Sequence, residues 1–198
     1  MKNIVSLGIV LLVGMLAGPA FAGPIVDPTA TVTSTDLGGG VFDYKINLTD
    51  SSSSPAPIGT FWFAWVPPGT DFMDKAPISV TSPTGWTDLV TNTGATDGFG
   101  IQWVANPDSV ITPGKSLTFE FTSTETPQQL MGNSPFHPTF PEGTSFVYSG
   151  KPLSDPGTEF TMVAASSPPA VPEPSSLALT LAGGLLLIAR RIRKVGNR

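Results

Sequence analysis

The stretch Phe42-Asp43-Tyr44-Lys45-Ile46-Asn47-Leu48 alternates strictly between large apolar and polar side chains. Successive side chains of a β-strand point to opposite faces, so a period of two predicts a strand with one buried and one solvated face. The same alternation recurs in residues 117–122 and, over a shorter length, in residues 99–103. The body of the chain is therefore predicted to consist of half-buried strands.

Further strand candidates lie at residues 29–34, 59–66, 77–82, 144–149 and 158–164. Clusters of Gly, Pro, Asn and Ser separate them, as in residues 50–57 and 112–115, and these residue types favour turns. About eight short strands with frequent turns predict an all-β fold, an antiparallel β-sandwich of immunoglobulin-like or jelly-roll type. No helical period occurs between residues 23 and 170, a length sufficient for two sheets around one core.

Composition narrows the class of protein further. The 198 residues include no cysteine, which excludes disulfides and cysteine-ligated metal sites. The segment from Asp27 to Glu173 holds all fifteen acidic residues and only four lysines, a net charge of −11, while the two ends of the chain hold the other six cations. A nucleic-acid partner is not expected, because this segment has no basic stripe to neutralise phosphates. The acidity is interpreted as solubility outside the cell.

The N-terminus has the pattern of a secretory signal peptide, predicted as a signal helix over residues 1–22. A short positive start that includes Lys2 precedes an apolar run over residues 4–16, and a small-x-small cleavage site follows at Ala20 and Ala22. Gly23 is the expected first residue of the mature protein, which begins with the sandwich domain over residues 23–165. The alternative is an uncleaved membrane anchor.

The C-terminus has three parts in order. A Pro-rich linker over residues 166–174 ends in the motif Val171, Pro172, Glu173 and Pro174, whose prolines keep the backbone extended. An apolar run over residues 177–189 and a basic cluster follow, within a predicted transmembrane helix and tail over residues 175–198. The cluster comprises Arg190, Arg191, Arg193 and Lys194, together with the terminal Arg198. Positive residues after an apolar run stop translocation and hold that end in the cytoplasm.

The length of the apolar run leaves two interpretations open. Thirteen residues of helix cover about 20 Å, which is shorter than the ~30 Å hydrocarbon core of a bilayer. A buried C-terminal helix of a globular domain is the alternative. The cations behind the run favour the membrane, where snorkelling arginine side chains and local bilayer thinning extend the span.

The order Pro-Glu-Pro, apolar run and arginine cluster resembles the C-terminal sorting signal of PEP-CTERM proteins, over residues 171–194 only. The resemblance implies that exosortase, an integral-membrane enzyme similar to cysteine transpeptidases, recognises Pro172, Glu173 and Pro174 as its processing element. It also implies a Gram-negative bacterium that makes exopolysaccharide. The protein would pass through the inner membrane to the cell surface or the extracellular matrix. The resemblance does not say what the body does.

No residue pattern in the body predicts an enzyme or a cofactor. A Ser-His-Asp triad would depend on His137, the one histidine, which lies between prolines without a Gly-x-Ser-x-Gly motif. Residues 112–116 contain Gly-Lys-Ser but lack the earlier glycine of a phosphate loop, so they are interpreted as a turn. Glu120 and Glu125 are conceivable as a glycosidase pair, yet Glu120 falls on the polar face of its strand.

Calcium and sugar are the two ligands that the sequence allows. Calcium would use loop oxygens of Asp71 with Asp74, or of Asp88 with Asp97, but no EF-hand or Asp-rich repeat is present, and no metal site is predicted.

In residues 60–65, alternation places Phe61, Phe63 and Trp65 on one face and Trp62 on the other, partly exposed or covered by a loop. Trp86 follows a turn, where its ring could reach the surface. Exposed rings of Trp62 and Trp86 would stack on sugars; the other interpretation is that all four tryptophans are packing residues. The expected function is therefore an exported, non-catalytic β-sandwich in a structural or adhesive role, and the alternative is a carbohydrate-binding module for exopolysaccharide.

Overall fold

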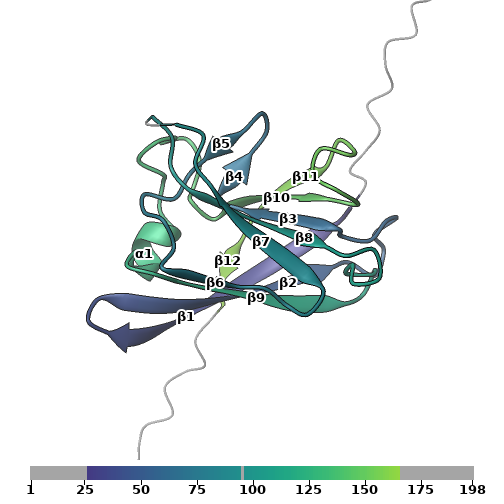
Figure 1. The fold of residues 1–198 in the computed structure, drawn as a ribbon, viewed down its shortest axis with the longest axis horizontal. Coiled ribbons are helices and arrows are strands. Elements are labelled where there is room, and N and C mark those ends of the chain that lie inside the picture. Colours follow the sequence, from purple (N-terminus) through teal and green to yellow (C-terminus); the bar gives the residue numbers. More distant parts are fainter. Residues whose placement is uncertain (1–25, 95, 166–198) are drawn as a thin grey trace, which may run out of the picture. The chain divides into compact units, whose positions relative to one another are not determined.

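The alternating stretch around Tyr44 forms β2 (Val41–Asp50), the central strand of a five-stranded sheet. β2 pairs antiparallel with β1 (Pro28–Gly38) on one side and with β9 (Ser116–Ser123) on the other. The sheet is completed by β6 (Ser79–Thr81) beside β9 and by β12 (Val163–Ala164) beside β1. The computed structural model that shows this arrangement describes residues 26–94 and 96–165 (Figure 1).

A second five-stranded sheet covers the first. Its order is β11 (Thr158–Thr161), β10 (Thr144–Tyr148), β3 (Thr60–Phe63), β8 (Gly100–Ala105) and β7 (Trp86–Thr91), and each neighbouring pair is antiparallel. A small two-stranded sheet, β4 (Trp65–Val66) with β5 (Thr70–Asp71), extends from β3. The helix α1 (Pro127–Leu130) is a single turn at one end of the sandwich (Figure 1).

The core lies between the two sheets and is mostly aromatic. Phe119 of β9 is the central contact: its ring lies 5.1 Å from Phe61 of β3, 5.2 Å from Trp103 of β8 and 5.0 Å from Trp86 of β7, between centroids. Phe61 and Trp103 stack on each other at 5.3 Å. These rings bring strands from both sheets into one apolar layer, which confirms the antiparallel β-sandwich predicted from the alternation.

Every strand expected from the sequence is present, and the stretches 59–66 and 158–164 each form two short strands instead of one. Strands β5 and β7 were not expected. The prediction that residues 23–170 contain no helix is wrong by one turn, because α1 forms between Pro127 and Leu130. Thr126 and Gln129 make a reciprocal capping box at its start, and this local pattern does not depend on any helical period.

The predicted targeting segments lie outside the described residues. These are the signal peptide 1–22 with its cleavage site, the motif at residues 171–174, the apolar run 177–189 and the basic cluster after it. Within the ranges 26–94 and 96–165, no helix is long and apolar enough to cross a membrane.

Candidate functional site

Trp86, whose ring the sequence allowed either at the surface or in the packing, is a core residue. Its side chain is 5% exposed and meets Phe119 edge-on. Its indole Nε1–H donates to the backbone oxygen of Ser109 at 2.8 Å. The turn before it places Gly85 at a φ of 82°, where a Cβ atom would meet the Ser109 side chain at 2.0 Å. The turn therefore directs Trp86 inward, and of the two interpretations that the sequence left open for this ring the structure shows packing.

Trp62, the other predicted sugar contact, lies on the outer face of the second sheet but is covered there. Its ring is 8% exposed and stacks on Trp65 with the centroids 4.2 Å apart. With Phe146 and Tyr148 of β10, the two tryptophans form a separate cluster, called the aromatic cluster below. Of the two positions that the sequence allowed for Trp62, the structure shows the covered one.

Trp65 is on the opposite face from the one predicted. Alternation from Phe61 and Phe63 would place it in the core, yet it belongs to the aromatic cluster with Trp62. The reason is Ala64, whose φ of 54° is left-handed and interrupts the extended backbone between β3 and β4.

The loop between β10 and β11 packs against the aromatic cluster. At Gly157, with φ 64°, a Cβ atom would lie 2.1 Å from Cε1 of Phe146 and 2.8 Å from Cε1 of Tyr148. Asp155 holds the loop by accepting from the backbone N–H of Ser149 at 2.9 Å and from that of Gly157 at 2.8 Å. Burial, and then the Asp155 carboxylate, raises the pKa of Tyr148 to about 12.

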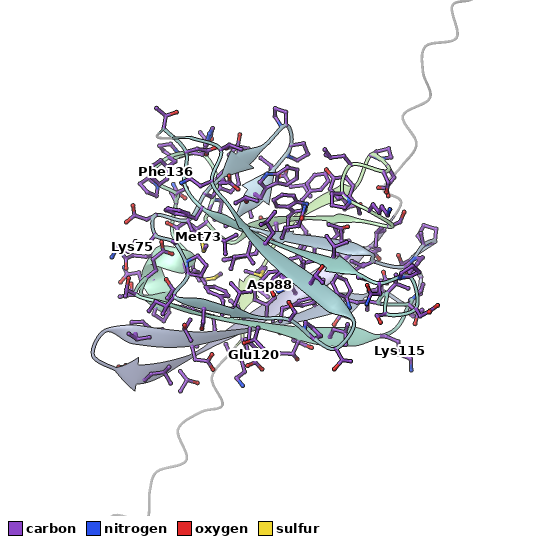
Figure 2. All side chains as sticks on the ribbon, in the orientation of Figure 1. Met73, Lys75, Asp88, Lys115, Glu120 and Phe136 are labelled. Atoms are coloured by element: carbon purple, nitrogen blue, oxygen red, sulfur yellow. The ribbon has the colours of Figure 1, made fainter. Side chains whose placement is uncertain are left out.

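Glu120, the first member of the predicted carboxylate pair, points away from the core on the outer side of its sheet (Figure 2). Lys45 Nζ donates to Glu120 Oε1 at 3.2 Å, across the β2–β9 register. This confirms that Glu120 lies on the solvated face and separates it from Glu125, which is completely buried.

Glu125 is instead paired with Glu142, a residue that the sequence did not single out. The two side chains are 0% and 2% exposed, and their carboxyl groups lie close enough to form a hydrogen bond once one of them carries a proton. Glu125 Oε1 also accepts from the backbone N–H of Lys75 at 2.6 Å. We call Glu125 and Glu142 the acid pair.

The acid pair holds a proton at neutral pH. Burial, and then the neighbouring charges of Glu125 and Asp74, raise the pKa of Glu142 to about 9. Burial also raises the pKa of Glu125, against the hydrogen bonds that it accepts from Glu142 and Lys75. In this arrangement the two carboxyl groups share one proton, because two carboxylates in one buried place cannot both stay charged.

A signal for the burial of Glu125 was present in the sequence. The inward-facing residues of β9 are Phe119, Phe121 and Ser123, at every second position. Glu125 is the next residue in this series and is buried like them. Glu142 has no such signal, because it follows an irregular stretch with no period.

The four aspartates considered for calcium are held by different neighbours. The backbone N–H of Asp71 donates to Asp97 Oδ1 at 3.0 Å, and the Thr93 hydroxyl bonds to both carboxylates. Asp74 lies near the acid pair, and Asp88 accepts from the Ser82 hydroxyl. Over residues 26–94 and 96–165, no group of three or more His, Asp or Glu side chains is placed to hold a metal ion.

The remaining candidates are structural. The His137 ring packs edge-on against Phe72, with centroids 5.5 Å apart, and its backbone N–H donates to Ser134 Oγ at 3.3 Å. The Gly-Lys-Ser sequence forms a turn in which the Lys115 N–H donates to the Thr112 oxygen at 3.0 Å, and β9 begins at Ser116. A strand follows the turn, as predicted.

Comparisons with known proteins leave the family open. No protein-family model and no curated protein matches the sequence. Among solved structures, an uncharacterised Nocardia farcinica protein with an immunoglobulin-like fold matches at 14% identity and a TM-score of 0.41, over 68% of this chain and 98% of that one. An exo-β-N-acetylglucosaminidase of Vibrio harveyi matches at 8% identity, with TM-scores of 0.37 for an inactive mutant and 0.38 for the complex with N-acetylglucosamine. The match covers 70% of this chain and 18% of the enzyme.

Proposed function

We propose that this chain is an exported protein of the cell surface or extracellular matrix, delivered through a PEP-CTERM-like signal that exosortase processes. The observation that carries the proposal is the order of segments at the C-terminus: the Pro-Glu-Pro motif, the apolar run 177–189 and the arginine cluster. Together with the signal peptide at residues 1–22, this order predicts passage through the inner membrane and a transient or permanent anchor there.

The position of the described strands is compatible with this processing. The described strands run from Pro28 to Ala164, between the two targeting segments. Cleavage after Ala22 and near residues 171–174 would therefore leave every described strand in the mature protein. A processed form would keep the core, including the stacked rings of Phe61 and Trp103.

The body has a non-catalytic, structural or adhesive role in this proposal, with no cofactor. The acid pair is 98% or more buried, so it offers no carboxyl group to a substrate, and Glu120 is bound to Lys45 on the solvated face of its sheet. An adhesive role needs exposed apolar side chains, and the described surface has six large ones: Leu37, Ile78, Leu89, Val90, Leu153 and Val163. The choice between an immunoglobulin-like and a jelly-roll sandwich stays open in this proposal.

Exopolysaccharide binding, the alternative function, is weakened by the burial of Trp62 and Trp86. Stacking on a sugar requires an exposed ring face, and both rings are less than 10% exposed. A sugar ligand would have to use other residues. Retention of the purified mature domain on the host's own polymer, compared with an unrelated polysaccharide, tests this alternative directly.

The experiment that tests sorting is the intact mass of the protein from culture medium and from the cell envelope. A released form that begins near Gly23 and ends near residues 171–174 is the expected result. Recovery only of a membrane form that retains residues 177–198 would show a permanent anchor and refute processing.

A matched pair of variants assigns the cleavage to the motif. Replacing Pro172, Glu173 and Pro174 with alanine should abolish release. Replacing Pro168 and Pro169, the other two linker prolines, should leave release unchanged. Equal release from both variants would remove the motif from the proposal.

A further inference from the structure

The acid pair joins the two ends of the segment that connects β9 to β10. Glu125 follows β9 directly, and Glu142 lies just before β10, so the segment 126–141 leaves and returns at these two side chains. The segment contains α1, whose Leu130 is completely buried, and Phe140, which stacks on Phe72 with centroids 5.4 Å apart. Opening of this segment would expose apolar surface at one end of the sandwich.

Glu125 belongs to the rigid body of the sandwich. Its backbone oxygen accepts from the Tyr44 hydroxyl of β2 at 2.6 Å, and its backbone N–H donates to Ser123 Oγ at 3.0 Å. Its side chain accepts from the Lys75 N–H at 2.6 Å, in the connection between β5 and β6. Figure 2 shows Lys75 beside α1 at this end of the sandwich.

Glu142, directly after the segment, is bound to it. Its backbone N–H donates to the Gly132 oxygen at 2.9 Å, and Ser134 N–H donates to the Phe140 oxygen at 2.9 Å, so these bonds close the segment on itself. The segment is also bound to the body by the Ser134 hydroxyl, which donates to the Phe72 oxygen at 2.7 Å. The carboxyl contact between Glu142 and Glu125 therefore connects a locally closed segment to a fixed point.

The contact between the carboxyl groups of Glu125 and Glu142 is attractive only when one of them is protonated. Oε2 of Glu125 and Oε2 of Glu142 are both buried, and neither has a partner when both carboxyl groups are ionised. A proton on Glu142 supplies the missing donor, and its loss leaves two carboxylates facing each other out of water. The charged and titratable groups around the pair are Asp74 and Lys75 from the connection after β5, and Tyr44 from β2.

We propose that Glu125 and Glu142 form a proton-operated latch, which holds the segment 126–141 closed while the two carboxyl groups share a proton and releases it as that proton is lost. The closed state binds one proton more than the open state, in which both glutamates are solvated and ionised. The equilibrium constant for opening should therefore rise by up to tenfold per pH unit once the pH exceeds 4.5, the ordinary pKa of glutamate. The rise should end near pH 9, where the closed pair also loses its proton.

Hydrogen exchange of the full-length chain in detergent micelles, followed by mass spectrometry between pH 5 and pH 9, measures this opening. Protection of peptides from 126–141 is corrected for the intrinsic exchange rate. Peptides from β3 and β8 in the same samples report global unfolding. The expected result is a segment that exchanges faster than the two central strands at every pH and loses protection as the pH rises. The strands also lose protection, because global unfolding releases the same proton, but they start from a higher level. Constant protection of the segment from pH 5 to 9 would overturn the proposal.

Two isosteric variants separate the latch from other titrations. In Glu142→Gln the amide donates to Glu125 without a titratable proton, so protection should no longer depend on pH. Glu120→Gln makes the same replacement on the exposed face of β9 and should keep the wild-type slope. His137, the titratable ring within the segment, is retained in both variants. A wild-type slope in Glu142→Gln would assign the effect to that histidine or to the fold and reject the latch.

A bound cation is the remaining way to satisfy two carboxylates, and the same series tests it. Measurements in EDTA should match those in calcium chloride if a proton operates the latch. Protection that persists at pH 9 only in calcium would show a metal bridge and overturn the proton-operated mechanism. Glu125→Gln, which keeps one carboxyl group and one amide in the pair, provides a second variant should Glu142→Gln fail to fold.

Discussion

Trp62 and Trp65 stack with their ring centroids 4.2 Å apart and their planes inclined by 19°, although a regular strand would point residues three apart to opposite faces. Ala64 produces this contact. Its φ of 54° ends the extended conformation after Phe63, and Trp65 begins β4 with its side chain turned back over Trp62. A single left-handed residue therefore builds the aromatic cluster outside the core.

Substitutions of Ala64 should separate the backbone requirement from the packing requirement. Ala64→Gly accepts the left-handed conformation without strain and should change the free energy of unfolding by less than about 1 kcal/mol. Ala64→Val places a β-branched side chain at a completely buried site with positive φ and should cost at least about 2 kcal/mol. Urea denaturation measures both, and equal stability of the two variants would contradict this account.

The strands could be predicted because their side chains alternate between two environments. In β2, Tyr44, Ile46 and Leu48 face the core, and the residues between them are partly or fully exposed. β7 could not be predicted in this way. It is an edge strand, with Leu89 56% and Val90 39% exposed although they point to opposite faces, so its sequence has no period to detect.

The burial of the acidic residues could be predicted only in part from the sequence. Glu125 continues the inward parity of β9, as Asp50 continues that of β2, so the pattern could have placed both inside. The parity of a strand alone does not predict that a carboxyl group is inside, because charged residues are rarely buried without a partner. The partner of Glu125 comes from an irregular segment, and only the fold brings Glu142 to it. The position of Trp86 stayed open for a related reason, since a turn before a residue does not determine which way its side chain points.

Trp86 should behave as a core residue. Trp86→Ala removes the ring that meets Phe119 and should lower the free energy of unfolding by about 3–5 kcal/mol. Trp86→Phe keeps an aromatic ring but loses the Nε1–H bond to Ser109, and should cost less. Thermal or urea unfolding measures the series. Unchanged stability of Trp86→Ala would mean that the ring is exposed, the other position that the sequence allowed.

Gly157 and Gly39 form a matched pair for the loop over the aromatic cluster. Their φ values are 64° and 65°, but a Cβ atom at Gly39 meets nothing within 4 Å, and one at Gly157 meets Phe146 at 2.1 Å. Gly39→Ala should cost about 1–2 kcal/mol from backbone strain alone. Gly157→Ala should cost more, and the difference in unfolding free energy reports the packing of the loop on the cluster. Equal costs would place the loop away from Phe146.

The arginine cluster should set the orientation of the unprocessed protein. Replacing Arg190, Arg191 and Arg193 with glutamate removes the positive charge that keeps this end in the cytoplasm, so retention in the membrane before processing should fall. Replacement of the same residues with lysine keeps the charge and should preserve retention. Fractionation of cells that lack the processing enzyme compares the two. Unchanged retention of the glutamate variant would count against a stop-transfer role.

Asp50 should make the sandwich less stable as the pH rises. The carboxyl group is completely buried and both of its oxygens lack a partner, since the nearby Ser54 hydroxyl gives its one proton to the Ala56 oxygen. Burial, and then the charge of Asp27, raises the pKa of Asp50 above its ordinary value of 3.8. The folded state thus retains a proton that the unfolded chain releases. Stability is greatest below pH 3.8 and falls by up to about 1.4 kcal/mol per pH unit above it, until the folded group ionises.

Asp50→Asn isolates this effect from the acid pair, because Glu125 and Glu142 are unchanged in the variant. Wild type and variant should have similar unfolding free energies near pH 4, and the variant should become the more stable one as the pH rises to 7. Urea unfolding at both values, with Asp27→Asn as a control for the smaller charge effect, measures the difference. A variant that is less stable than wild type at pH 7 would show that the Asp50 carboxylate has a partner in solution and that its charge stabilises the fold.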